Sequence, residues 1–202
     1  MSTSITAERT RALARLAVEL GANVSEGQDV VVLVVDVAYA ELAREIAEAA
    51  YRVGAHYVSV LYWDQHVKRS RLVHAAEDSL GYTPGWWDRH IEDCVEDHGA
   101  NIVIWGDPNP DLLNDIDPAR TRRDSMPLTG ALHAMHASGE VNWTVVPGVS
   151  SGVARRLLGT DDIEALWEVY APILRLDADD PVRAWREHMG HLRERAGALS
   201  AR

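Results

Sequence analysis

The sequence is short of cysteine and of long apolar segments. Cys94 is the only cysteine in 202 residues, so no intrachain disulfide and no cysteine-based zinc cage can form. Acidic residues flank Cys94 on both sides, and neighbouring negative charge raises the pKa of a thiol. We therefore expect an inert, buried Cys94 and not a nucleophile.

The longest apolar run, residues 30–35, is far too short to cross a bilayer. Residues 1–16 include Glu8, Arg9 and Arg11 and have no continuous apolar stretch, so they do not resemble a secretory signal. These two absences predict no membrane partner and a cytoplasmic location.

Positive charge is also scarce. Lys and Arg total 20 against 31 Asp and Glu, which gives a net charge of −11. This balance opposes binding to nucleic-acid phosphates unless basic residues gather on one face. Two basic runs occur, at residues 68–71 and 120–123, and neither is interleaved with the aromatic residues that stack on bases. We expect no nucleic-acid partner.

Phenylalanine is absent, but seven Trp and six Tyr supply aromatic volume, and hydrophobic residues make up 47% of the chain. Short β-branched runs alternate with amphipathic segments, a pattern typical of buried parallel strands and their crossover helices. The expected strands are residues 29–37, 56–62, 101–105 and 141–146. The expected helices are residues 7–20, 40–53, 84–99, parts of 118–137 with a break near Pro127, 152–158, 161–174 and 180–199.

This alternation predicts an α/β fold with a mostly parallel sheet of about four or five strands, flanking helices and a helical C-terminal segment. We expect an α/β domain over residues 1–160 and a helical extension over residues 161–202. The apolar faces of that extension include Trp167, Tyr170 and Trp185. Large exposed apolar faces mark interfaces, so we expect these residues to pack on another surface and the chain to self-associate.

Two histidine pairs stand at helical spacing, His133 with His136 and His188 with His191. Each pair places two imidazoles on one helical face, but a zinc site needs three or four ligands and no HExxH spacing occurs. Surface histidines are the favoured interpretation. The alternative is a metal site that is completed across a dimer interface.

The stretch PGVSSG, residues 147–152, joins an expected strand to an expected helix. No phosphate-binding fingerprint accompanies it, and Ser150 and Ser151 lack the GxSxG context of a nucleophile. We interpret it as a tight turn. The alternative is an anion cradle built from backbone N–H groups.

The polar loop after the second expected strand is the best-placed candidate site. An apolar run, residues 58–62, stops at Trp63, Asp64, Gln65 and His66. Ligands of open α/β sheets bind at the carboxyl ends of the strands, so Trp63, Asp64 and His66 are candidate cavity-lining residues. The alternative is that they are turn residues without a functional role.

Several segments, taken in order, resemble the N-terminal portion of the bacterial thermophilic-type metalloaminopeptidases, the aminopeptidase T and aminopeptidase S group. They read LARLAVELGANVSEGQDVVV, ELAREIAEAAYRVGAHYVSVLYWDQHVKR, EDSLGYTPGWW, GDPNPDLL, VNWTVVPGVSSGVAR and DDPVRAWREHMGHLRERAGAL. No single motif among them is a catalytic signature, and the ordered set covers nearly the whole chain.

The resemblance implies a protein about twice as long that removes N-terminal amino acids from peptides with two divalent metals, cobalt, zinc or magnesium. It places the metal ligands in a C-terminal catalytic domain, toward which residues 161–202 would lead, and it implies a homodimer. No residue here matches a ligand position, so we assign no catalytic residue and no metal ligand to this chain. We expect a structural, dimerisation and cavity-wall role without activity of its own. The alternative is a stand-alone α/β domain that binds a small ligand.

Overall fold

A computed structural model describes residues 5–200. At its centre is a four-stranded sheet in which every strand is parallel to its neighbours, in the order β2-β1-β3-β4. The predicted fold class is therefore confirmed, although the first strand ends three residues before its predicted end. The strands are β1 (Asp29–Val34), β2 (Tyr57–Tyr62), β3 (Ala100–Trp105) and β4 (Asn142–Pro147).

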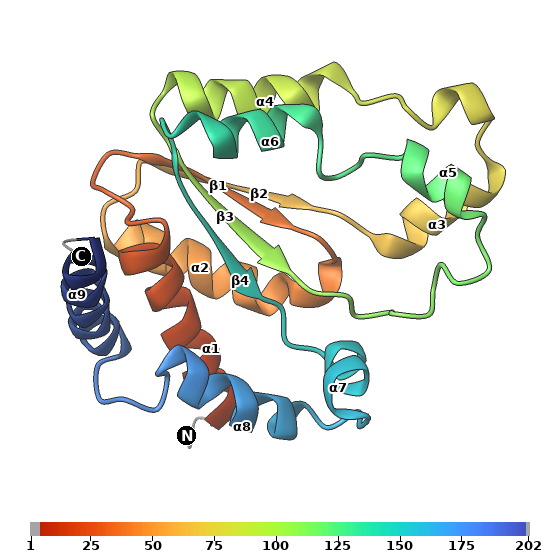
Figure 1. Ribbon diagram of the computed structural model, residues 1–202. Helices are drawn as coiled ribbons and strands as arrows, with labels where there is room; N and C mark the ends of the chain where they lie inside the picture. The colour runs from red at the N-terminus through yellow and green to blue at the C-terminus, as the bar shows by residue number, and fades with distance from the viewer. Residues whose placement is uncertain (1–4, 201–202) are drawn as a thin grey trace.

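Helices cover both faces of the sheet. One face carries α1 and α2, and the other carries α4 and α6, so that the body has three layers (Figure 1). The helices are α1 (Ile5–Leu16), α2 (Ala40–Arg52), α3 (Gln65–His74), α4 (Gly85–Glu96), α5 (Pro118–Arg123), α6 (Gly130–Ser138), α7 (Ser151–Leu158), α8 (Ile163–Leu174) and α9 (Pro181–Ser200), with short η1 (Ala17–Gly21), η2 (Val37–Tyr39) and η3 (Glu77–Ser79).

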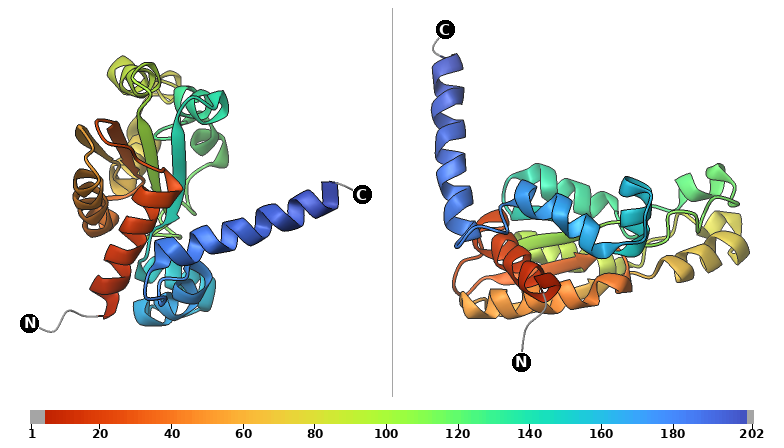
Figure 2. Two further views of the ribbon diagram at one scale, coloured as in Figure 1. Left: turned by 90° about the vertical axis from the view of Figure 1, so that its left-hand side faces the viewer. Right: turned by 90° about the horizontal axis from the view of Figure 1, so that it is seen from below.

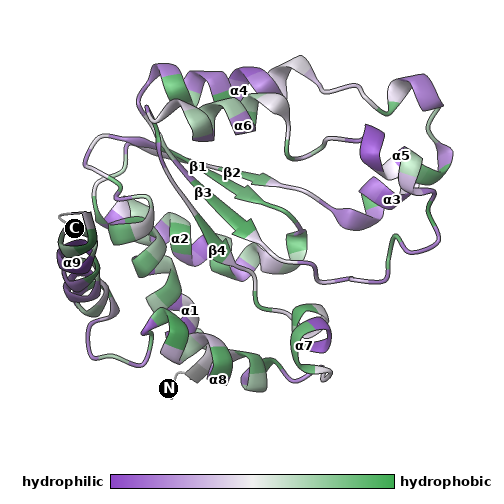
Figure 3. Cartoon of the chain, in the orientation of Figure 1, coloured by the Kyte–Doolittle hydropathy of each residue, from purple (hydrophilic) through white to green (hydrophobic). Residues whose placement is uncertain are grey.

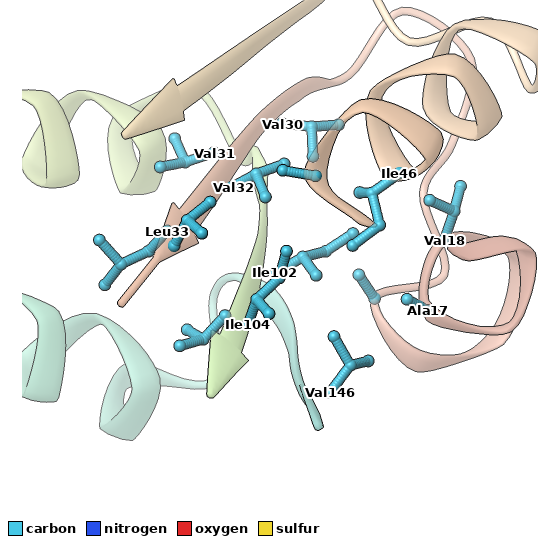
Figure 4. Close-up of a cluster of buried hydrophobic side chains, with 14 of the residues drawn as sticks. Ala17, Val18, Val30, Val31, Val32, Leu33, Ile46, Ile102, Ile104 and Val146 are labelled. Carbon is cyan, nitrogen blue, oxygen red and sulfur yellow. The ribbon is translucent and has the colours of Figure 1, made fainter. Parts of the chain in front are cut away.

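The core follows from the apolar strands. Both central strands are buried on both faces, as a parallel sheet between two helical layers requires. Figure 4 shows Val30 and Val32 of β1 close to Ile46 of α2, with Val146 of β4 completing the same cluster. Figure 3 shows the strands among the most hydrophobic segments. Cys94 lies in this core, where burial raises the pKa of its thiol to about 11, as expected for an inert cysteine.

Helix α8 is part of the same packed body. Trp167 is only 2% exposed and belongs to the main core cluster, so the expectation that it lies on an outward apolar face is wrong. Arg9 of α1 pairs with Glu168 of α8 at 2.8 Å and with Asp177 at 3.2 Å. The division at residue 160 stays a prediction about the domain organisation of a longer protein.

Helix α9 is anchored at its start and projects away from the body (Figure 2). The half-buried Trp185 donates its indole N–H to the carbonyl oxygen of Leu174 at 2.6 Å. Residues 191–200 are exposed along their whole length. None of the helices within residues 5–200 is both long and apolar enough to cross a membrane.

Candidate functional site at the carboxyl edge of the sheet

The chain enters a helix, α3, directly after β2 and Trp63. Asp64 is its N-cap, and its Oδ1 accepts hydrogen bonds from the backbone N–H groups of His66 at 2.8 Å and Val67 at 3.0 Å. The expectation of a loop here is therefore wrong. An N-cap Asp followed by ten residues free of Gly and Pro was the signal that could have revealed α3.

A second carboxylate fixes the start of α3 at the carboxyl end of β1. Asp36 follows β1, is 4% exposed, and accepts from the N–H of Ala38 at 2.9 Å and from the N–H of Gln65 at 3.1 Å. Asp36 thus connects the end of β1 to Gln65, the first residue of α3, which follows β2. Asp36 was not among the predicted site residues, although an Asp directly after a fully apolar run pointed to it.

The Asp36→Ala variant is expected to lose about 2 kcal/mol of unfolding free energy, because two backbone N–H groups lose a charged acceptor. The matched variant Asp64→Ala removes an ordinary N-cap and should lose about 1 kcal/mol. Urea denaturation of both variants measures the difference. An Asp36→Ala variant no less stable than Asp64→Ala would show that Asp36 does not anchor α3.

The basic run on α3 binds loops of the same chain. Lys68 donates to the carbonyl oxygen of Met126 at 2.5 Å, and Arg69 makes a two-pronged contact with Asp115 at 2.5 and 2.7 Å. Arg71 reaches three backbone carbonyl oxygens, those of Ser79, Leu80 and Tyr82.

The second basic run acts in the same way. Arg120 of α5 donates to the carbonyl oxygens of Leu72 and Ala75, both at 2.6 Å, and Arg123 pairs with Glu77 at 2.6 Å. Residues 65–82 and 107–128 therefore form a polar lobe beyond the carboxyl ends of the strands. Hydrogen bonds from Lys and Arg side chains to backbone carbonyl oxygens hold this lobe together. Figure 3 shows α3 and part of α5 as strongly hydrophilic.

A buried charge cluster lies at the base of the polar lobe. The side chain of Asp124 is fully buried, with Lys68 Nζ at 3.8 Å and an Arg71 nitrogen at 3.5 Å. The backbone N–H of Met126 donates to the same carboxylate at 3.2 Å. Burial lowers the pKa of Lys68, and the Asp124 carboxylate opposes that shift.

A cavity of about 350 Å³ opens between the polar lobe and the sheet edge. Trp63 lines this cavity, whereas Asp64 and His66 are not among its lining residues, and His66 is exposed. The cavity-lining role of Asp64 and His66 stays a prediction. The lining residues are Val35, Trp63, Gln65, Lys68, Trp105, Gly106, Asp107, Asn109, Pro110, Leu113, Thr121, Asp124, Ser125, Met126, Pro127 and Leu128.

The turn at residues 147–152 is closely packed, in agreement with its interpretation as a tight turn. Ser150 caps α7 by accepting from the N–H of Val153 at 3.3 Å, and its hydroxyl lies 3.3 Å from the hydroxyl of Tyr39. A Cβ at Gly148 would lie 2.4 Å from the Tyr39 ring. Burial raises the pKa of Tyr39 to about 12, so this hydroxyl stays protonated at neutral pH.

The histidines of α6 make structural contacts. His136 donates through Nε2 to Oδ1 of the buried Asn101 at 2.9 Å and stacks on Trp143 at 4.2 Å between ring centroids. His133 bonds the carbonyl oxygen of Thr129 at 2.9 Å. Burial and the neighbouring His133 lower the pKa of His136, which favours its neutral form.

The other pair lies on α9, where His188 meets the edge of Trp185 and His191 is exposed. Across residues 5–200, no group of three or more His, Cys, Asp and Glu side chains is placed to hold a metal ion. Each histidine pair therefore lacks a third ligand within the described part of the chain.

The sequence matches the family described as thermophilic metalloprotease (M29) over residues 6–202. The chain belongs to the M29 family. It is 33% identical to aminopeptidase T of Thermus thermophilus over 94% of its own length and 48% of that protein, and 34% identical to aminopeptidase AmpS of Bacillus subtilis over 96% and 49%. The solved structure of wild-type AmpT from Thermus thermophilus superposes with a TM-score of 0.80 at 27% identity, over 96% of this chain and 48% of that one.

This M29 chain spans about half the length of the relatives it matches. The family is one of metalloproteases, but the described residues do not supply the donor set that a protease metal centre requires.

Proposed function

We propose that this chain is the N-terminal domain of a metal-dependent aminopeptidase and that it supports catalysis by another domain. The observation that carries the proposal is the match of nearly the whole chain to about half of each aminopeptidase relative. A two-metal hydrolase needs about five or six carboxylate and imidazole ligands to hold its ions and activate water. The absence of such a group from residues 5–200 supports a structural role for this domain.

An apolar surface beside β4 supports packing against another domain. Three exposed apolar side chains border one surface pocket at the end of β4. They are Trp105 (50% exposed), Val145 (49%) and Leu157 (58%). Contiguous exposed apolar side chains on a folded domain mark an interaction surface. In this proposal the catalytic domain of the same protein covers that surface and α9 leads toward it.

The purified 202-residue chain is expected to release no detectable p-nitroaniline from leucine p-nitroanilide, with cobalt or zinc added, because it cannot assemble a two-metal centre. Aminopeptidase T of Thermus thermophilus in the same assay is the positive control. Turnover by this chain that a chelator abolishes would overturn the proposed non-catalytic role.

A homodimer and a cytoplasmic location belong to the same proposal. The exposed apolar residues beside β4, together with Leu192 and Leu199 on the projecting part of α9, support self-association of the isolated chain. Sedimentation velocity over a range of concentrations tests it. A monomer at every concentration would remove the dimer from the proposal.

A further inference from the structure

The cavity under the polar lobe lies where the chain changes direction across the sheet. From β1 the chain passes to β2 on one side, and it then returns to β3 on the other side of β1. The carboxyl ends of β1 and β3 diverge at such a switch point, which makes it the usual ligand site of an open α/β sheet. Val35 after β1, Trp63 after β2 and Trp105 at the end of β3 all line the cavity.

The volume and walls of the cavity suit a small organic molecule. Its volume of about 350 Å³ lies in the range of small-ligand pockets, roughly 300–1,000 Å³. Much of the wall is apolar, with a few polar groups among aromatic and aliphatic side chains. The apolar lining residues are Val35, Trp63, Trp105, Pro110, Leu113, Met126, Pro127 and Leu128.

One hydrogen-bond donor on this wall, the Lys68 ammonium, is not fully used. Lys68 is 16% exposed and has three N–H donors, of which one bonds the Met126 carbonyl oxygen. The Asp124 carboxylate, at 3.8 Å, is beyond hydrogen-bond distance from the ammonium nitrogen.

Charges of both signs lie at the cavity, and Lys68 is the cation on its wall. Lys68 and Arg71 share the single buried carboxylate of Asp124, and the second acidic residue of the wall balances the remaining positive charge. Asp107 is the other acidic residue on the wall, and its Oδ1 accepts from the Asn109 N–H at 3.0 Å. A ligand with an ammonium group next to its carboxylate would match both Lys68 and Asp107.

We propose that this switch-point cleft binds a small organic carboxylate with an apolar body. The carboxylate oxygens accept from the Lys68 ammonium, while the apolar body packs between Trp105 and the Met126–Leu128 segment. Charge-assisted hydrogen bonds of this kind are the strong ones, and a largely apolar surround strengthens them. The residues that bind the ligand all belong to this chain and require no metal ion, and Trp105 also borders the surface that the catalytic domain is proposed to cover.

The test is an NMR titration of the full 202-residue chain with four small molecules, read at the indole N–H signals of Trp63 and Trp105. The molecules are 4-methylpentanoate, leucine, leucinamide and inorganic phosphate. Both carboxylates with an isobutyl body should shift these signals. Leucinamide, which lacks the carboxylate, and phosphate, which lacks the apolar body, should leave them in place.

Two variants assign the binding groups. Lys68→Gln keeps a donor for the Met126 carbonyl oxygen but removes the charge, and it should weaken binding of 4-methylpentanoate by about tenfold, read at Trp105. Trp105→Ala removes an exposed apolar wall of the cavity and should weaken binding several-fold, read at the Trp63 indole N–H. This variant tests the proposal if Lys68→Gln does not fold.

Tighter binding of leucine than of 4-methylpentanoate would support a contact between its ammonium and Asp107. Equal affinities would support recognition through the carboxylate alone. Three outcomes would each overturn the proposal. They are signals that none of the four molecules shifts, a response to leucinamide equal to that for the carboxylates, and undiminished affinity in a folded Lys68→Gln variant.

Discussion

Replacing Trp167 with alanine is expected to lower the free energy of unfolding by about 4 kcal/mol, the largest effect of any single substitution considered. The side chain is 2% exposed and packs in the main core cluster from α8, which follows the last strand. Deleting it removes a large buried apolar surface and leaves a cavity between α8 and the body. Urea denaturation with a single fluorescence and circular-dichroism transition measures the loss.

The matched substitution is Trp167→Phe. The indole nitrogen of Trp167 is buried and has no hydrogen-bond partner within the described residues, so removing it relieves an unsatisfied polar group. Phenylalanine retains much of the packing and should cost less than half of the alanine effect. A Trp167→Ala variant with near-normal stability would show that α8 is not part of the cooperative folding unit.

Gly152→Ala is expected to destabilise the protein by about 3 kcal/mol, at the upper end of overpacking effects. A Cβ at this position would lie 2.0 Å from the carbonyl oxygen of Pro108, which belongs to the loop after β3. Backbone atoms cannot rotate away as a side chain can, so the loop or the start of α7 must move. The change in thermal or urea midpoint against the unmodified protein gives the magnitude.

Gly190→Ala is the control for Gly152→Ala. Both glycines lie in helices, but only Gly152 packs against another segment of the chain. No atom lies within 4 Å of a Cβ at Gly190. Helix propensity alone should therefore raise stability by up to about 1 kcal/mol in α9. The same chemical change thus carries opposite signs at the two positions. Equal effects at both would rule out the close packing of α7 against the loop after β3.

Local sequence patterns predicted most of the elements of this fold. The continuous Val and Leu run of β1 predicts a parallel strand that is covered on both faces. The Ala-rich stripe of α2, at helical spacing, predicts the crossover helix. Both patterns involve only residues that are close together in the sequence. The short helix α3 was missed because only Leu72 of its residues is buried, which leaves a weak apolar stripe. Asp64 is the N-cap signal for this helix, and the expectation of a loop leaves that signal out.

The sequence by itself determined the fold class, the family and the absence of a HExxH motif. The fold class and the motif depend on the spacing of nearby residues, and the family depends on the ordered set of segments. Only the tertiary structure decided the strand order and the partners of the charged residues. Lys68 and Arg71 on α3 contact Asp124, which lies in a segment distant in sequence. Asp36, which follows β1, accepts a hydrogen bond from Gln65, which follows β2. Such pairings depend on which loops the sheet brings to one edge, and no local period encodes that choice. The sequence places Trp63 at the carboxyl ends of the strands, but the cavity beside it exists only because residues 105–128 and α3 come together there.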